Sequence, residues 1–125
     1  MAVVAVYSMK GGVGKSCTAV NLAWNSAAGS SRRTLLWDLD AQGAASFILQ
    51  GDQMDKDRAH AMIAGKLKPA KLVRHTDIGN LDLLAADLSL RGLDRLFSQI
   101  GKRRHLGKLL KQLIKDYDRI ILDCP

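Results

Sequence analysis

The 125-residue sequence has few cysteines, few aromatic residues and no long apolar run. Its two cysteines, Cys17 and Cys124, do not form a metal-ligand spacing, and they do not suggest the disulfide framework of a secreted domain. No stretch is long enough to span a bilayer, and the short N-terminal apolar run lacks the basic leader of a signal peptide. The sequence therefore predicts a cytoplasmic protein without a membrane segment.

The overall composition is that of one globular unit. Hydrophobic residues make up 47% and charged residues 25% of the chain, which is ordinary for a soluble domain. A chain of 125 residues can bury a core of its own. The net charge of +7 is uneven, because residues 67–125 carry twelve basic against seven acidic side chains, whereas residues 1–66 carry seven against five.

The pattern of apolar residues predicts strands that alternate with helices. Such alternation is typical of the α/β class, in which a mostly parallel sheet is covered by helices on both faces and the crossovers are right-handed. The predicted strands are Ala2–Tyr7, Thr34–Leu39, Leu81–Ala85 and Arg119–Leu122. The predicted helices are Lys15–Ala28, Ala44–Leu49, Lys56–Ala64, a short one near Ala70–Arg74, Leu90–Phe97 and Lys102–Lys115. No repeat or linker divides the chain, so we expect a single domain over residues 1–125.

A glycine-rich segment, SMKGGVGKS at Ser8–Ser16, lies between the first predicted strand and the first predicted helix. Gly14–Ser16 fit the end of the phosphate-binding loop G-x-x-x-x-G-K-[ST]. In that loop, backbone amides surround the phosphates, the lysine reaches the β and γ oxygens and the hydroxyl holds Mg²⁺. Met9 stands where the template has its first glycine. The phosphates would lie at a helix N-terminus, where free N–H groups and the helix dipole favour anions.

The segment KGGVGKS, Lys10–Ser16, resembles the deviant Walker A motif of the ParA/MinD family of P-loop ATPases. The resemblance implies a P-loop NTPase fold that binds ATP and Mg²⁺. It also implies that Lys15 serves its own nucleotide, whereas Lys10 reaches across a homodimer to the nucleotide of the partner subunit. A cation that arrives from a partner stabilises charge on the transferring phosphoryl group. The implied nucleotide-binding residues are Lys10, Gly11, Gly12, Val13, Gly14, Lys15, Ser16 and Cys17.

Two aspartates follow the second predicted strand. The segment DLDAQG, Asp38–Gly43, resembles the D-x-D-P-Q-G segment of ParA proteins, with Ala41 where proline is usual. Carboxylates at the carboxyl end of a parallel strand lie where such sheets bind ligands. The resemblance assigns Asp40 to the orientation or activation of the attacking water, and Asp38 to the Mg²⁺ shell and to switching. The alternative is a pair of exposed loop aspartates without a function, since aspartate is common in turns.

The last predicted strand also ends in an aspartate. Tyr117–Pro125, YDRIILDCP, has the form of a Walker B element, in which Asp123 would hold Mg²⁺ through water. Cys124 and Pro125 match the start of the D-C-P-P turn of the family, and Asn80–Leu90 resembles the third strand and following turn of ParA more than of MinD. The predicted metal-binding residues are therefore Ser16, Asp123 and Asp38.

The resemblance covers essentially the whole sequence but only the N-terminal half of family members, which continue for about as long again. We therefore expect a P-loop domain that is truncated after the Walker B strand and lacks the base-recognition residues, so that ATP rather than GTP is implied by the family alone. If missing strands pair beside Ala2–Tyr7, that strand becomes a bare hydrophobic edge. The chain should then self-associate even without nucleotide.

A run of basic residues lies near the C-terminus. Lys102–Lys115 contains six basic and no acidic residues, and its apolar residues recur at helical spacing. The apolar residues expected to face the sheet are Leu106, Leu109, Leu110, Leu113 and Ile114. The bases either keep the helix soluble or contact DNA phosphates without sequence preference. The candidate DNA-binding residues are Lys102, Arg103, Arg104, Lys108 and Lys111.

Two classes of function remain open at this point. The resemblance implies a ParA-type ATPase of plasmid or chromosome partitioning, which sandwiches ATP in a homodimer, binds nonspecific DNA on the nucleoid and responds to a ParB-like partner. The alternative is a nucleotide-binding or DNA-binding module without turnover, because the missing half would remove base contacts and dimer surface. A MinD-like membrane-positioning ATPase is a weaker variant of the first class.

Overall fold

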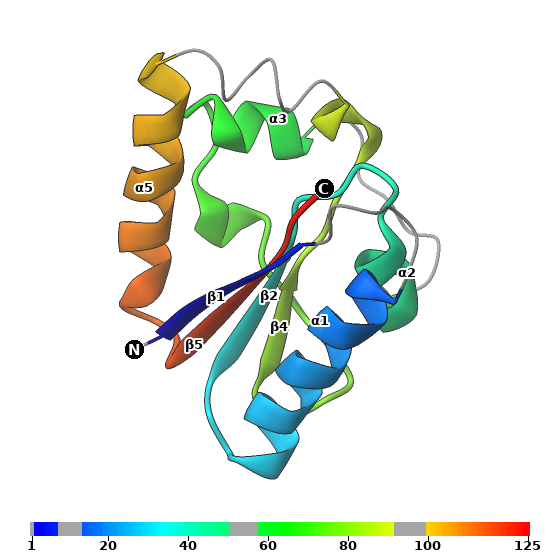
Figure 1. The fold of residues 1–125 in the computed structure, drawn as a ribbon. Coiled ribbons are helices and arrows are strands. Elements are labelled where there is room, and N and C mark those ends of the chain that lie inside the picture. Colours follow the sequence, from blue (N-terminus) through cyan, green and yellow to red (C-terminus); the bar gives the residue numbers. More distant parts are fainter. Residues whose placement is uncertain (1, 8–13, 51–57, 92–99) are drawn as a thin grey trace.

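The computed structural model describes residues 2–7, 14–50, 58–91 and 100–125, apart from the side chains of His60 and of residues 100–105. Its centre is a five-stranded sheet in the order β1-β5-β2-β4-β3 (Figure 1). The strands are β1 Ala2–Val6, β2 Thr34–Asp38, β3 Arg74–His75, β4 Leu81–Leu84 and β5 Arg119–Asp123. β1, β5, β2 and β4 are parallel, and β3 pairs antiparallel with β4. The prediction of an α/β fold with a mostly parallel sheet is confirmed.

Helices cover both faces of this sheet (Figure 1). The longer helices are α1 Lys15–Trp24, α2 Ala44–Gln50, α3 Arg58–Ile63 and α5 Ile100–Ile114. Three short segments complete the described secondary structure: the π-helical η1 Asn25–Gly29, and the 3₁₀ turns η2 Pro69–Lys71 and η3 Leu88–Leu90. α1 and α2 lie on one face, and α5 and α3 lie on the other.

The central strand β2 shows why the fold has two cores. Its side chains alternate between the faces, so that Leu35 and Trp37 pack with Leu113 of α5, whereas Leu36 packs with Ala23 of α1. All five residues of β2 are buried. Strands that are buried on both faces have continuous apolar sequences rather than alternating ones, and Leu35, Leu36 and Trp37 of β2 form such a run. Burial of each such Leu side chain contributes about 2 kcal/mol.

Two local predictions differ from the structure, and a third lies mostly outside the described residues. The helix expected near Ala70–Arg74 is wrong, because the 3₁₀ turn ends at Lys71 and Arg74 begins β3. Of the helix expected at Leu90–Phe97, residues 92–97 lie outside the described residues, and Leu90 closes η3. Ile114 does not face the sheet but is 38% exposed, whereas Leu109 and Leu113 of α5 are buried in the core and Leu106 and Leu110 pack against it.

The two edges of the sheet differ in their protection. Among the described strands, β1 pairs with β5 alone, and its side chains Val3 and Val4 are each 42% exposed. The opposite edge, β3, is two residues long and carries Arg74 and His75. Short, charged edge strands resist pairing with other chains, and uncharged apolar ones invite it. The structure thus confirms that the first strand is an apolar edge.

Candidate nucleotide-binding site

The site begins where the sheet meets the N-terminus of α1. Gly14 has a φ of 65° and caps the helix, so Lys15 is the first helical residue. Glycine adopts this left-handed conformation without the steric cost that a side chain imposes. The parallel pairing of β2 with β5 places Asp38 directly beside Asp123. The N-terminus of α1 and the carboxyl ends of two parallel strands therefore meet at one edge of the sheet, as in α/β folds that bind ligands there.

Lys15 lies among acidic side chains. Its ammonium forms a close ion pair with Asp123 Oδ1 and lies 3.3 Å from Asp40 Oδ2. Ser16 Oγ donates a hydrogen bond to Asp123 Oδ2 at 2.8 Å. Burial alone would lower the pKa of Lys15, but the carboxylates of Asp123 and Asp40 outweigh it and hold that pKa above its usual range. The lysine is thus kept charged, and the predicted residues from three distant segments converge on it.

Asp38 is buried and fully engaged by donors. Its Oδ1 accepts from the backbone N–H of Asp40 at 3.1 Å, and its Oδ2 accepts from the N–H and the hydroxyl of Ser46 at 2.9 and 2.6 Å. Burial raises the pKa of Asp38 to about 6, although the bonds from Ser46 and Asp40 act in the opposite direction. Asp40 in turn accepts from the N–H of Gln42 at 3.0 Å. Asp38 is thus bonded to Ser46 and to the Asp40 backbone, whereas the Asp40 side chain contacts Lys15 in the site.

Comparison with known proteins places this chain in a family. The family model of an AAA domain, AAA_31, matches residues 1–125. This chain belongs to the ParA/MinD-type ATPase domains. It is 32% identical over 125 residues to the sporulation initiation inhibitor protein Soj of Bacillus subtilis, covering 98% of this chain and 49% of Soj. The chromosome partitioning protein ParA of Myxococcus xanthus is 36% identical over 128 residues, covering 98% of this chain and 44% of that protein.

Solved structures agree with the sequence relatives. Cobyrinic acid a,c-diamide synthase from Mycobacterium smegmatis, solved with ADP and magnesium, matches with a TM-score of 0.82 and 35% identity. The match covers the whole of this chain and 51% of the synthase. The cell division ATPase MinD of Pyrococcus furiosus matches with a TM-score of 0.77 and 25% identity, over 98% of this chain and 49% of MinD. The ParA/MinD-type domain described here thus spans about half the length of the proteins it resembles.

The donor atoms of this candidate site fit a magnesium ion. The Ser16 hydroxyl and the Asp123 carboxylate supply hard oxygen ligands, hydrogen-bonded to each other at 2.8 Å. Mg²⁺ in phosphoryl-transfer sites is commonly held by one or two carboxylates together with substrate phosphates. These two residues are therefore suited to hold the ion beside the phosphates that Lys15 would bind.

Several predicted residues do not enter this geometry. Lys10, Gly11, Gly12 and Val13 lie outside the described residues. Cys17 is exposed in the first turn of α1. Cys124 is half-buried next to Asp123, and burial raises the pKa of its thiol. Among the candidate DNA-binding residues, the side chains of 102–104 are not described, whereas Lys108 and Lys111 are exposed on α5.

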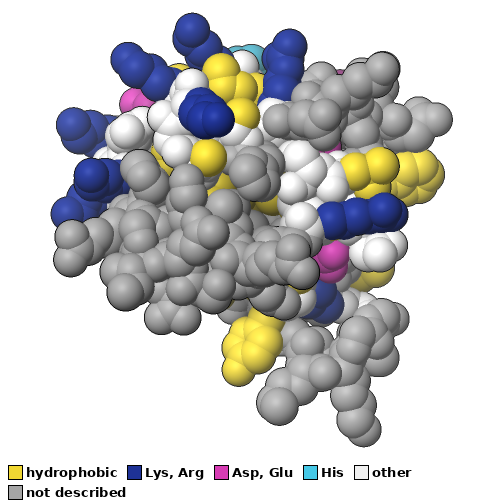
Figure 2. Space-filling model, turned by 90° about the horizontal axis from the view of Figure 1, so that it is seen from above, with side chains coloured by type: hydrophobic (Ala, Val, Ile, Leu, Met, Phe, Trp, Pro, Cys, Tyr) yellow, Lys and Arg dark blue, Asp and Glu magenta, His cyan; other side chains and the backbone are white. Residues whose placement is uncertain are grey.

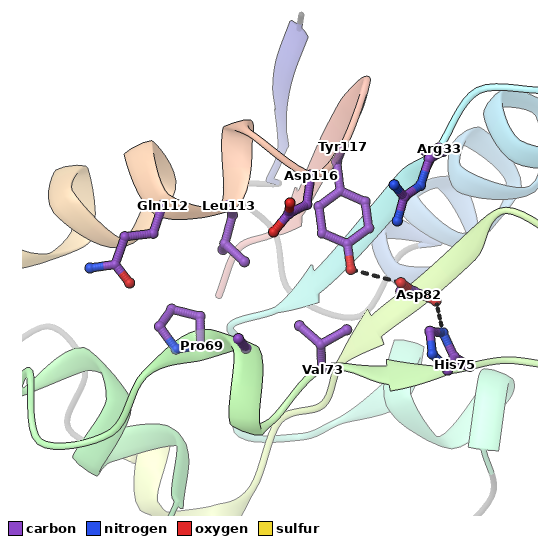
Figure 3. A pocket seen from close by; sticks show the side chains of 10 residues that line it. Arg33, Pro69, Val73, His75, Asp82, Gln112, Leu113, Asp116 and Tyr117 are labelled. Carbon is purple, nitrogen blue, oxygen red and sulfur yellow. Dashed lines mark hydrogen bonds and ion pairs between the residues drawn. The ribbon is translucent and has the colours of Figure 1, made fainter.

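Away from the candidate site, a depression of about 260 Å³ lies between α5 and the segment that leads into β3 (Figure 3). There Asp82 accepts a hydrogen bond from Tyr117 at 2.7 Å and contacts His75 Nδ1 at 2.6 Å. Arg33 lies 5.7 Å from the centre of the Tyr117 ring. Burial and the neighbouring Asp82 carboxylate raise the pKa of the Tyr117 phenol, which stays a donor. These contacts join β3, β4 and the start of β5 at the sheet end opposite Asp38 and Asp123, and we assign them a structural role.

The sequence did not reveal two features of the molecule. Ser46 was not predicted, although it bonds Asp38, because a serine in a short helix has no pattern that indicates such a contact. Lys66 and Lys68 were also missed. They line a depression of about 320 Å³ together with Lys108 of α5, which is distant in sequence.

Proposed function

We propose that the chain binds Mg²⁺-ATP at this site and forms the N-terminal part of a ParA-type partitioning ATPase. The observation that carries the proposal is the convergence of Lys15, Asp40 and Asp123 at the carboxyl ends of two parallel strands. Its support is the membership of the ParA/MinD-type family and the similarity to Soj and ParA proteins. The runner-up, a binding module without turnover, shares the site and differs only in phosphate release.

The described geometry supports a separate role for each side chain of the site. Lys15 is held charged by two carboxylates, so it can exchange one of them for a phosphate oxygen without a change of protonation. Ser16 and Asp123 would hold Mg²⁺, which supplies neutralisation of phosphate charge when bound. Asp40 lies 3.3 Å from the ammonium of Lys15. Its carboxylate is therefore near the phosphates and can orient a water or accept its proton.

The finer parts of the proposal rest on the resemblance of Lys10–Ser16 to the deviant Walker A motif. Lys10 would act on the nucleotide of the partner subunit in a homodimer, with ATP between the two subunits. A ParB-like partner would stimulate ATP hydrolysis and the release of the dimer from DNA. The protein would act in the cytoplasm on the nucleoid. Among the residues that the structure describes, no helix is long and apolar enough to span a membrane.

DNA binding is supported by a basic surface that extends beyond α5. Lys66 and Lys68, from the loop after α3, line the same depression as Lys108. Figure 2 shows Lys and Arg side chains gathered on the side of the molecule where α5 lies in Figure 1. Such a surface contacts phosphates and releases counterions, irrespective of base sequence. We therefore add Lys66 and Lys68 to the proposed contacts Lys108 and Lys111.

Steady-state phosphate release from Mg²⁺-ATP tests the proposed function. We expect the 125-residue chain to release phosphate, and the Asp40→Ala variant to bind ATP but release phosphate at least about 100-fold more slowly, as a lost acid–base group does. Asp77→Ala is the matched control, because it removes an exposed carboxylate from the loop before β4, at the other end of the sheet. Binding without any release by the unmodified chain would favour the module without turnover.

A further inference from the structure

A buried hydrogen-bond chain leads from the sheet to the proposed catalytic carboxylate. It starts at the backbone N–H of Ala86, which donates to Ser46 Oγ at 2.9 Å. Ser46 donates to Asp38, and Asp38 accepts from the backbone N–H of Asp40. Asp40 then reaches the ammonium of Lys15. The chain therefore links the segment after β4, the first turn of α2 and the end of β2 to the nucleotide site.

Ser46 is the junction of this chain. It is 1% exposed, and its hydroxyl uses its one proton towards Asp38 and a lone pair towards Ala86. Removal of the hydroxyl would take this acceptor from the buried Ala86 N–H. It would also free Asp38 from its shortest contact, at 2.6 Å. Both effects loosen the attachment of α2 and of the loop that carries Asp40.

The orientation of Asp38 decides which role it has. Both of its oxygens accept bonds from backbone or hydroxyl donors of Asp40 and Ser46, and the residue is 0% exposed. Asp123, by contrast, directs its oxygens at Lys15 and Ser16. A carboxylate with this set of contacts fixes a loop rather than meeting a phosphate.

We propose that Ser46 and Asp38 are positioning residues, which hold the Asp40 loop at the distance from Lys15 that hydrolysis requires. The proposal rests on the proposed function, since positioning has an effect only where Asp40 takes part in turnover. Misplacement of a catalytic group by about 1 Å can cost about 100-fold in rate. The loss should therefore appear in kcat and not in the affinity for nucleotide, because Lys15 and Ser16 keep their places.

The test compares two buried serines. Ser46→Ala removes the junction, and Ser26→Ala removes an equally buried hydroxyl that bonds Thr34 at 2.6 Å at the far end of the sheet. Both variants should lose stability. We expect Ser46→Ala alone to lower kcat at least about ten-fold with an unchanged Kd for Mg²⁺-ATP, and Ser46→Thr, which keeps the hydroxyl, to recover most of that loss.

The outcomes distinguish failure of the positioning role from failure of the proposed function. Equal kcat in Ser46→Ala and Ser26→Ala would overturn the positioning role and leave the proposed function intact. Absence of phosphate release from the unmodified chain would overturn both. If Ser46→Ala does not fold, Asp38→Asn takes its place. Asparagine keeps the shape of the side chain but has only one oxygen that can accept. In the unmodified chain Asp40 and Ser46 donate to different oxygens of Asp38, so the substitution breaks the same hydrogen-bond chain. An unchanged kcat in that variant would also overturn the positioning role.

Discussion

The pair formed by Lys15 and Asp123 predicts a strong coupling between two residues that are 108 positions apart. The side chain of Lys15 is 11% exposed and that of Asp123 is 0% exposed, so neither charge is well solvated. Removing one partner of a buried pair leaves the other uncompensated and costs about 3 to 5 kcal/mol. Lys15→Met should therefore destabilise the chain by about 3 kcal/mol.

The reciprocal change should cost less. Asp123→Asn leaves the ammonium of Lys15 with its second carboxylate, Asp40 at 3.3 Å, so we expect a loss of about 2 kcal/mol. In the double variant neither charge remains unpaired. Its destabilisation should fall short of the sum of the two single changes by about 1 to 3 kcal/mol, which is the coupling energy of residues in direct contact.

Urea unfolding in the absence of nucleotide measures this cycle. Trp37 is 1% exposed in β2, and its fluorescence reports the loss of the core. The free energy of unfolding is obtained for the four chains under one buffer condition. Additive effects, within about 0.5 kcal/mol, would show that the two residues do not interact in solution and would refute the described arrangement of the site.

Three further predictions concern other parts of the molecule. Asp38 has a pKa of about 6 in the folded chain, above its ordinary value of 3.8, so between these values it binds more protons in the folded than in the unfolded chain. Its contribution to stability should therefore fall by about 2 kcal/mol from pH 4 to 7. If the free energy of unfolding of the unmodified chain and that of Asp38→Asn change equally with pH over this range, the prediction is wrong. Val4→Lys should charge the exposed β1 edge and abolish self-association in light scattering; a monomeric unmodified chain at high concentration would argue against the open edge. Joint replacement of Lys66, Lys68 and Lys108 by alanine should reduce the slope of log K against log salt for duplex DNA by about 0.9 per lost phosphate contact. Exposed Arg32, before β2, is the control for the DNA measurement, and an equal effect of Arg32→Ala would refute a specific basic surface.

Much of the fold follows from local sequence patterns. The four parallel strands are rich in apolar residues, although β4 includes Asp82, and each is followed by a polar turn or a helix, as is typical of parallel sheets. β3 escaped recognition because it is two residues long, and a two-residue strand has no alternation to detect. Its place is set by pairing with β4 and by the hydrogen bond of Arg74 to Gln50 at 3.1 Å.

The site was predictable in part for the same reason. Lys15, Ser16, Asp40 and Asp123 each stand in a motif that is local in the sequence, and the structure brings them together. The contacts of Ser46 depend on Asp38 and on Ala86, which is 40 positions away. No window of sequence contains that relation, because it arises only when the segment after β4 is placed beside α2. The basic depression of Lys66 and Lys108 arises in the same way, from the packing of a loop on α5.

Calorimetric titration of Mg²⁺-ATP into the 125-residue chain and into Lys15→Ala tests the central claim most directly. The account predicts saturable binding by the unmodified chain and its loss in the variant, with the fold of the variant verified by circular dichroism. Binding of equal affinity by both chains, or no binding by the unmodified chain, would contradict the assignment of Lys15 and its acidic neighbours as a nucleotide site.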